Sequence, residues 1–223
     1  MNRRKFVATS IAAGAATIAS SAARAAEKRT VRIVGVSCSP RKGKTTATAV
    51  GIALEAAKAV DSRVKTALVD LGGMEISGSS GGANTTKDDF DKVLPMFANP
   101  IPDGIIIGSP SYFRSMSALC KAFLERLAVL RKPRLILADV PTGVLAVGAY
   151  RNGGQELVIE QIQSIMLCHE VMIVGGKPGA HQGATLWNAY DDDITKDEFG
   201  MATAKQLGIR VAEAALRLTA AKA

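Results

Sequence analysis

Residues 31–46 read VRIVGVSCSPRKGKTT, and this stretch decides the fold. Its first six residues are mostly apolar and β-branched, which predicts a short buried strand. Small and polar residues follow, and from Thr45 to Val60 the apolar residues recur at helical spacing. The order strand, polar loop, helix places backbone N–H groups, hydroxyls and the cations Arg41, Lys42 and Lys44 at the positive end of a helix dipole. Such a position favours a phosphate group.

Two other interpretations of this loop stay open at this point. One is an ordinary turn between a strand and a helix, in which the hydroxyls only cap the helix. The other is the nucleotide-binding loop of an NTPase, because Gly43-Lys44-Thr45 ends like a Walker A motif. That motif has another glycine five residues before Gly43, where this chain has Cys38, and Pro40 removes one N–H group from the cradle. The pattern therefore favours the phosphate monoester of a cofactor.

Composition favours one α/β domain that binds no nucleic acid. The chain has 223 residues, of which 48% are hydrophobic and only 4% aromatic, and this suits a single domain with a sizeable core. The net charge is +8, but residues 1–25 hold four cations and no acid, and the remainder shows no basic stripe. The cysteines lack metal-ligand spacing and a disulfide framework. Cys38 lies in the loop, and Cys120 and Cys168 are expected to be buried packing residues.

The first 25 residues have the pattern of a bacterial export signal. Positive charge in residues 2–7 precedes an apolar, alanine-rich run, and Ala23-Arg24-Ala25 fits a small-residue cleavage site. The arginine pair near the start resembles a twin-arginine signal. We therefore expect residues 1–25 to be a signal peptide and residues 26–223 to form the mature domain. The protein is then periplasmic and meets the membrane only during export. A cytoplasmic amphipathic extension is the alternative.

Strands and helices are expected to alternate along the mature chain. Further strands are expected at 64–69, 103–108, 144–149 and 171–174, and helices at 87–97, 117–130, 155–168 and 199–219. Pro141-Thr142-Gly143 is expected to be a turn, and residues 71–86 and 175–193 to be long loops. This alternation predicts a parallel sheet with helices on both faces. The polar loops after strands one, three and four should meet at the carboxyl edge, where such sheets bind ligands.

These three loops carry a resemblance to a known family. The segments SCSPR (37–41), GSPSYF (108–113) with SMS (115–117), and RNGGQE (151–156) resemble the flavin loops of the NAD(P)H-dependent FMN reductase family. The similarity covers nearly the whole mature chain and is greatest to the iron–sulfur flavoprotein branch. It implies a flavodoxin-like three-layer α/β/α sandwich, with a five-stranded parallel sheet in the order 2-1-3-4-5. It also implies bound FMN, and relatives of this type commonly form homodimers or homotetramers.

The resemblance implies where the parts of FMN would lie. The phosphate would be surrounded by Ser37, Ser39, Arg41, Thr45 and Thr46, with Lys44 where the family often has asparagine. The ribityl chain and ring would pass along Pro110, Ser111, Tyr112, Phe113 and Ser115. The edge of the isoalloxazine would meet Gly148, Arg151, Gly153 and Gly154. The alternatives are that the two aromatic residues are ordinary core residues and that the third-loop arginine is a solvated surface residue. Because residues 71–86 contain no cysteine, where the iron–sulfur branch has its cluster, we expect no iron–sulfur cluster and no metal site.

The expected function follows from these assignments. Flavin chemistry requires the protein mainly to bind, orient and tune the cofactor, so no acid–base catalyst is predicted. We expect an exported FMN-dependent oxidoreductase that takes electrons from NAD(P)H or a redox protein and passes them to a quinone, a metal or another small acceptor. The alternatives are a flavodoxin-type electron carrier and a nucleotide- or phosphate-binding module without redox chemistry. His181 is expected at the surface, with an approach to the flavin as the alternative. Asp191-Asp192-Asp193 is expected to be a solvated turn.

Overall fold

The computed structural model describes residues 29–79 and 87–221. The predicted signal peptide and part of the long loop after the second strand lie outside the described residues. In the part of the chain that is described, no helix combines the length and the apolar character needed to cross a membrane.

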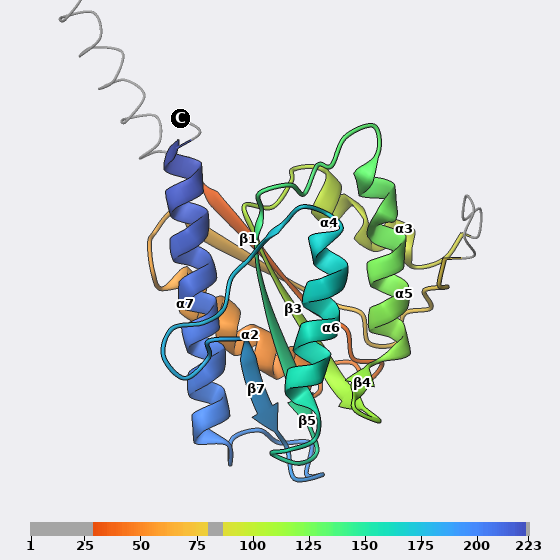
Figure 1. Cartoon of the computed structure of the whole chain (residues 1–223), viewed down its shortest axis with the longest axis vertical. Coiled ribbons are helices and arrows are strands. Elements are labelled where there is room, and N and C mark those ends of the chain that lie inside the picture. Colours follow the sequence, from red (N-terminus) through yellow and green to blue (C-terminus); the bar gives the residue numbers. More distant parts are fainter. Residues whose placement is uncertain (1–28, 80–86, 222–223) are drawn as a thin grey trace, which may run out of the picture.

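A mainly parallel sheet forms the middle layer of the molecule (Figure 1). Its strands are β1 (Val31–Ser37), β2 (Val64–Asp70), β3 (Gly104–Tyr112), β4 (Ser115–Met116), β5 (Pro141–Gly148), β6 (Met172–Ile173) and β7 (Ala184–Trp187). They follow the order β2-β1-β3-β5-β6, with β7 also beside β5 and β4 antiparallel to the end of β3. The predicted order 2-1-3-4-5 is therefore confirmed, with a fifth strand that is interrupted.

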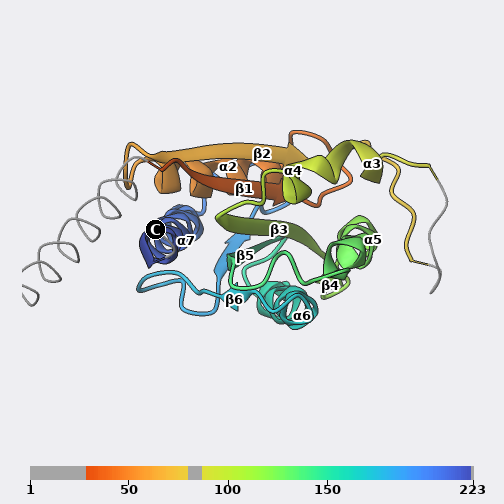
Figure 2. The same cartoon turned by 90° about the horizontal axis from the view of Figure 1, so that it is seen from above.

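Helices cover both faces of this sheet, as predicted (Figure 2). They are α2 (Thr45–Lys58), α3 (Phe90–Val93), α4 (Pro95–Ala98), α5 (Ala118–Arg126), the 3-10 helix η1 (Leu127–Arg131), α6 (Gln155–Leu167) and α7 (Glu198–Ala221). Alternate strand residues serve separate cores. Ile105 and Ile107 belong to the core under α5 and α6, whereas Ile106 belongs to the core under α2 and α7. This two-sided burial explains why the strands read as continuous apolar runs.

The fifth strand predicted at 171–174 is confirmed as β6, but the prediction that residues 175–193 form a loop is wrong, because they contain β7. β6 pairs only with the start of β5, at Pro141 and Thr142. The chain then leaves the sheet, and β7 returns to pair with Leu145–Gly148 at the end of β5. The buried second half of β5 needs partners for its backbone N–H and C=O groups. β7 supplies them, and its four residues alternate between buried and half-buried positions as a strand should.

The structure also corrects several expected boundaries. Pro141-Thr142-Gly143 is the start of β5 rather than a turn. Pro141 is tolerated as the first strand residue, and a side chain at Gly143 would lie 2.7 Å from a methyl group of Val211 on α7. The helix expected at 87–97 is divided into α3 and α4, and Pro95 begins the second. The helix expected at 117–130 tightens into η1 at Leu127.

The contact between α2 and α7 gives a test of the packing. At Gly208 on α7, an added Cβ would lie 1.9 Å from the carbonyl oxygen of Ala53, whereas nothing lies within 4 Å of a Cβ added at Gly51 on α2. We expect Gly208→Ala to lower the free energy of unfolding by about 1–3 kcal/mol through overpacking. Gly51→Ala should raise it by about 0.5–1 kcal/mol, because alanine favours a helix interior. Urea denaturation measures both values, and stabilisation by both substitutions would contradict the close packing.

Candidate cofactor-binding site

The loops after β1, β3 and β5 meet at the carboxyl edge of the sheet and are hydrogen-bonded to one another. The Ser117 hydroxyl, beyond the β3 loop, donates to the carbonyl of Cys38 at 2.6 Å. The Ser111 hydroxyl donates to the carbonyl of Gly153 at 2.7 Å. The predicted convergence of the three loops is therefore confirmed. The loops are not only close to one another but are joined by direct hydrogen bonds.

The first loop leaves the N-terminus of α2 without a cap. The N-cap residue is Lys44, and the described part of the chain offers it no side-chain capping bond and no acid in the first helical turn. The first N–H groups of a helix have no acceptor within the helix, so they can donate hydrogen bonds to a ligand. Thr45 and Thr46 are buried in this turn, and Ser39 is buried in the loop, where its hydroxyl accepts from the Arg41 N–H at 3.1 Å.

A carboxylate at the end of β2 shapes this loop. One oxygen of Asp70 accepts from the N–H of Gly43 at 2.7 Å, and the other accepts from the N–H of Gly72 at 3.1 Å. Gly43 has φ +67°, a conformation that glycine adopts without strain. Asp70 was not predicted as a site residue. The signal that it offered was its place at the carboxyl end of the strand beside β1.

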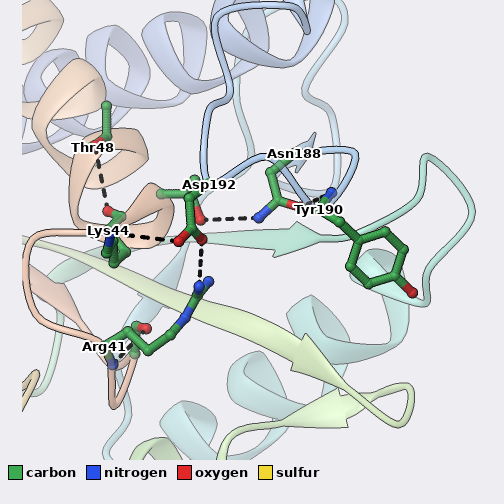
Figure 3. Close-up of polar contacts among 8 residues, drawn as sticks. Arg41, Lys44, Thr48, Asn188, Tyr190 and Asp192 are labelled. Carbon is green, nitrogen blue, oxygen red and sulfur yellow. Dashed lines mark hydrogen bonds and ion pairs between the residues drawn. The ribbon is translucent and has the colours of Figure 1, made fainter.

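A second carboxylate, that of Asp192, forms ion pairs with two cations of the first loop (Figure 3). One oxygen of Asp192 is paired with Nη1 of Arg41, and the other lies 3.5 Å from Nζ of Lys44. The hydrogen bond from Arg41, together with the positive charges of Arg41 and Lys44, lowers the pKa of Asp192 below its ordinary value. The expectation that residues 191–193 form a solvated turn is confirmed, because Asp191 and Asp192 are exposed in a turn. The sequence did not reveal that Asp192 binds the cations of the first loop.

The second loop forms a small hairpin between β3 and β4. Pro110 is buried in β3, whereas Tyr112 is partly exposed and Phe113 is fully exposed at the tip. The alternative of ordinary core aromatics is therefore wrong for these two residues. Phe113 and Arg114 have φ values of +50° and +64°, a strained conformation that clusters at functional sites.

Gln161 on α6 holds this hairpin in place through hydrogen bonds to β4. Its Oε1 atom accepts from the hydroxyl of Ser115 at 2.9 Å and from the N–H of Met116 at 3.2 Å. Gln161 was missed in the sequence, because nothing in a helical glutamine marks it as the partner of a loop 45 residues away.

The third loop is closed by Gln155 at the start of α6. Its Nε2 atom donates to the carbonyls of Tyr150 and Leu186, the latter at 3.0 Å. A Cβ at Gly148 would lie 2.5 Å from this same nitrogen, and a Cβ at Gly154 would lie 3.0 Å from Cα of Arg114. Both glycines thus allow close contact, the second with the hairpin.

Arg151 is exposed, as the alternative of a solvated surface arginine expected, but its side chain also contacts an aromatic ring. Its guanidinium lies 5.3 Å from the centre of the Trp187 ring on β7, in a cation–π arrangement. It lines a cavity of about 540 Å³ together with Arg114, Gly154, Gln155 and Thr185. The cavity places two guanidinium groups beside the third loop, where the flavin edge was predicted.

The donor set at this edge fits a phosphate monoester. It combines the uncapped N-terminus of α2, buried hydroxyls and two cations that already hold an anionic group. The buried hydroxyl of Ser37 has no hydrogen-bond partner within the described residues. A cofactor with one terminal phosphate would satisfy these groups.

The three cysteines and His181 were also candidate residues, and Cys38 lies between Ser37 and Ser39 in the first loop. Cys38 and Cys120 are buried, but Cys168 is exposed, and so its expected burial is wrong. Burial raises the pKa of the Cys38 thiol, which also contacts Cys120. His181 is exposed, as expected. Within residues 29–79 and 87–221, no group of three or more potential ligands is placed to hold a metal.

Comparisons with known proteins find relatives of similar sequence and structures of similar fold. The model of the family described as NADPH-dependent FMN reductase matches residues 31–185. An iron–sulfur flavoprotein of Methanocaldococcus jannaschii is 36% identical over 191 residues, which cover 82% of this chain and 96% of that protein. An NAD(P)H dehydrogenase (quinone) of Trichlorobacter lovleyi is 31% identical, over 53% of this chain and 64% of that protein. The solved structure of a WrbA-like flavodoxin from Agrobacterium tumefaciens superposes with a TM-score of 0.59 at 16% identity, covering 84% and 98%. The last comparison shows a flavodoxin-like fold.

Proposed function

Since the chain belongs to the NADPH-dependent FMN reductase family and is thus a flavin oxidoreductase, we propose that it holds FMN across the three loops. Electrons from NAD(P)H or a redox protein would pass through the flavin to a quinone, a metal or another small acceptor. The observation that carries this proposal is the uncapped N-terminus of α2 beside Arg41 and Lys44, joined by hydrogen bonds to the two later loops.

Each loop has a distinct part in the proposed site. The N–H groups of the first turn of α2, with the hydroxyls of Ser39, Thr45 and Thr46, would bind the phosphate. The hairpin, with Pro110, Ser111, Tyr112, Phe113 and Ser115, would run along the ribityl chain and the ring. Gly148, Gly153 and Gly154 would allow the ring edge to approach the backbone. Arg151 would place positive charge near that edge.

FMN, when bound, would supply the redox chemistry, because a flavin ring accepts and donates a hydride or single electrons. The protein then contributes binding, orientation and charge. Gln155 and Gln161 hold the two ring-side loops in place, and Asp70 holds the phosphate loop. No side chain needs to act as an acid or a base for this role.

Export and assembly are the finer parts of the proposal. The pattern in residues 1–25 supports twin-arginine export to the periplasm, and the family resemblance supports a homodimer or homotetramer. The absence of a cysteine cluster in residues 71–86 supports a protein without an iron–sulfur cluster. Cell fractionation tests the first of these proposals, and recovery of the full-length chain in the cytoplasm alone would contradict it.

A flavin titration tests the proposed function. The protein stripped of ligand is expected to bind FMN with quenching of flavin fluorescence, and NADPH under anaerobic conditions should then bleach the flavin absorbance. Steady oxidation of NADPH with a quinone would support the oxidoreductase. Bound FMN that only dithionite reduces would instead support an electron carrier. A protein that binds no flavin would refute both.

A further inference from the structure

Residues 188–192, which we call the strap, cross from the end of β7 to the N-terminus of α2 (Figure 3). The N–H of Asn188 donates to the carbonyl of Gly148 at 3.0 Å, and the N–H of Ala189 donates to that of Ala149 at 3.0 Å. These bonds continue the pairing of β7 with β5. The side-chain amide of Asn188 then donates to the hydroxyl of Thr45 at 3.4 Å. The strap is therefore fixed to the sheet at one end and reaches the proposed phosphate site.

The last residue of the strap, Asp192, places a negative charge at that site. The two carboxylate oxygens of Asp192 are divided between the two cations, one on Arg41 and one 3.5 Å from Nζ of Lys44. All three side chains are partly exposed, so the contacts can be broken without unfolding the core. In the structure, a carboxylate of the protein itself thus holds the cations that a phosphate would need.

The backbone of the strap is strained at three residues. Ala189, Tyr190 and Asp192 have φ values of +49°, +64° and +56°, which are costly for residues other than glycine. The conformation is maintained by a few contacts. The Tyr190 ring lies edge-on to that of Tyr150 at 5.1 Å, and the Tyr190 N–H donates to Oδ1 of Asn188 at 3.1 Å. A ligand that binds Arg41 and Lys44 would break the ion pairs that hold Asp192 in this conformation.

We propose that Asp192 competes with the phosphate of the cofactor for Arg41 and Lys44, and that the strap thereby weakens the binding of FMN. This inference rests on the proposed function, since it needs the phosphate to bind at the first loop. A phosphate monoester carries about −1.5 to −2 charges and three acceptor oxygens. It should therefore bind Arg41 and Lys44 more strongly than a single carboxylate does. The carboxylate must then move away or remain as a repelling like charge. Either outcome reduces the net affinity.

Two charge-matched variants test the competition. Asp192→Asn removes the charge from the loop, and Asp191→Asn removes the same charge one residue away, from a carboxylate that pairs with Lys196 instead. Flavin fluorescence gives the Kd of the ligand-free protein for FMN and for riboflavin, at constant ionic strength because exposed pairs are screened by salt. We expect Asp192→Asn to bind FMN about 3- to 10-fold more tightly than the wild type. Asp191→Asn should change the Kd less than about 2-fold, and riboflavin should bind equally to all three.

Other outcomes have separate meanings. Weaker binding of FMN by Asp192→Asn would overturn the inference, because Asp192 would then be a positioning residue that orients Arg41. An unchanged Kd would overturn it as well. If the wild type binds no flavin, the proposed function fails, and inorganic phosphate becomes the probe. Phosphate should then raise the melting temperature of Asp192→Asn at lower concentrations than that of the wild type. An equal response would refute competition at the loop itself.

Discussion

Replacement of Arg126 by methionine is expected to lower the free energy of unfolding by about 3–5 kcal/mol. Arg126 on α5 and Asp88 form an ion pair whose side chains are only 8% and 7% exposed. The guanidinium also donates to the carbonyl of Ser77 at 3.3 Å and lies 4.6 Å from the centre of the Phe90 ring. Methionine fills a similar volume but leaves the Asp88 carboxylate buried without its cation. The guanidinium thus holds Ser77 and Asp88 against α5, so its loss should also loosen these two residues from the helix.

The control for this variant lies one turn earlier on the same helix. Lys121 pairs with Glu125 at the surface, and Lys121→Met should cost less than about 1 kcal/mol, as exposed pairs do. Urea denaturation measures both variants. A loss of less than about 1 kcal/mol for Arg126→Met would show that the buried pair contributes little.

The pH dependence of this effect has a definite sign. Burial raises the pKa of Asp88, but the hydrogen bonds from the Ser77 N–H and from Arg126 outweigh it, and the pKa lies below the ordinary 3.8. A depressed folded-state pKa gives stability that is complete above the unfolded-state value and is lost as the pH falls through the folded-state value. The difference between wild type and Arg126→Met should therefore be constant near neutrality and shrink below about pH 4.

Segments that carry their own periodicity could be predicted from the sequence. The helices α6 and α7 begin and end within two residues of the expected positions, because their apolar residues recur at helical spacing over many turns. β7 could not be found in this way. It has four residues, and its place depends on the free edge of β5, some 40 residues earlier in the chain. A short strand of this kind is specified by its partner rather than by its own pattern.

The same distinction applies to the candidate site. The three loops were recognisable because each keeps its sequence motif next to a strand end. Three residues that hold these loops, Asp70, Gln161 and Asp192, act on segments that lie elsewhere in the chain. Asp192 and Arg41 are 151 residues apart. The acidic run at 191–193 could be weighed only as a local motif, and its role in the site follows from the fold that brings β7 to the end of β5.

Replacement of Arg41 by alanine is expected to raise the Kd for FMN by about 10- to 100-fold, the largest functional effect of a single substitution here. A hydrogen bond between a charged donor and a charged acceptor contributes about 1.5–3 kcal/mol, and every 1.4 kcal/mol corresponds to about tenfold in affinity. The fold should persist, because the Arg41 side chain is 45% exposed and its partner Asp192 is 36% exposed. Arg41→Lys keeps the charge but loses the planar fork, so its Kd should lie between those of wild type and alanine variant.

The comparison of two ligands makes this prediction specific to the phosphate. Riboflavin lacks the phosphate, so its Kd should be the same for wild type and Arg41→Ala. Lys65→Ala is the matched control, because it removes one positive charge from β2 on a side chain that contacts the carbonyl of Ser62, and FMN should bind it normally. Salt should weaken the binding of FMN to wild type more steeply than its binding to Arg41→Ala, since one screened ion pair is missing from the variant. An equal loss of affinity for FMN and riboflavin would mean that the first loop does not hold the phosphate, and the orientation of the flavin across the three loops would have to be reversed.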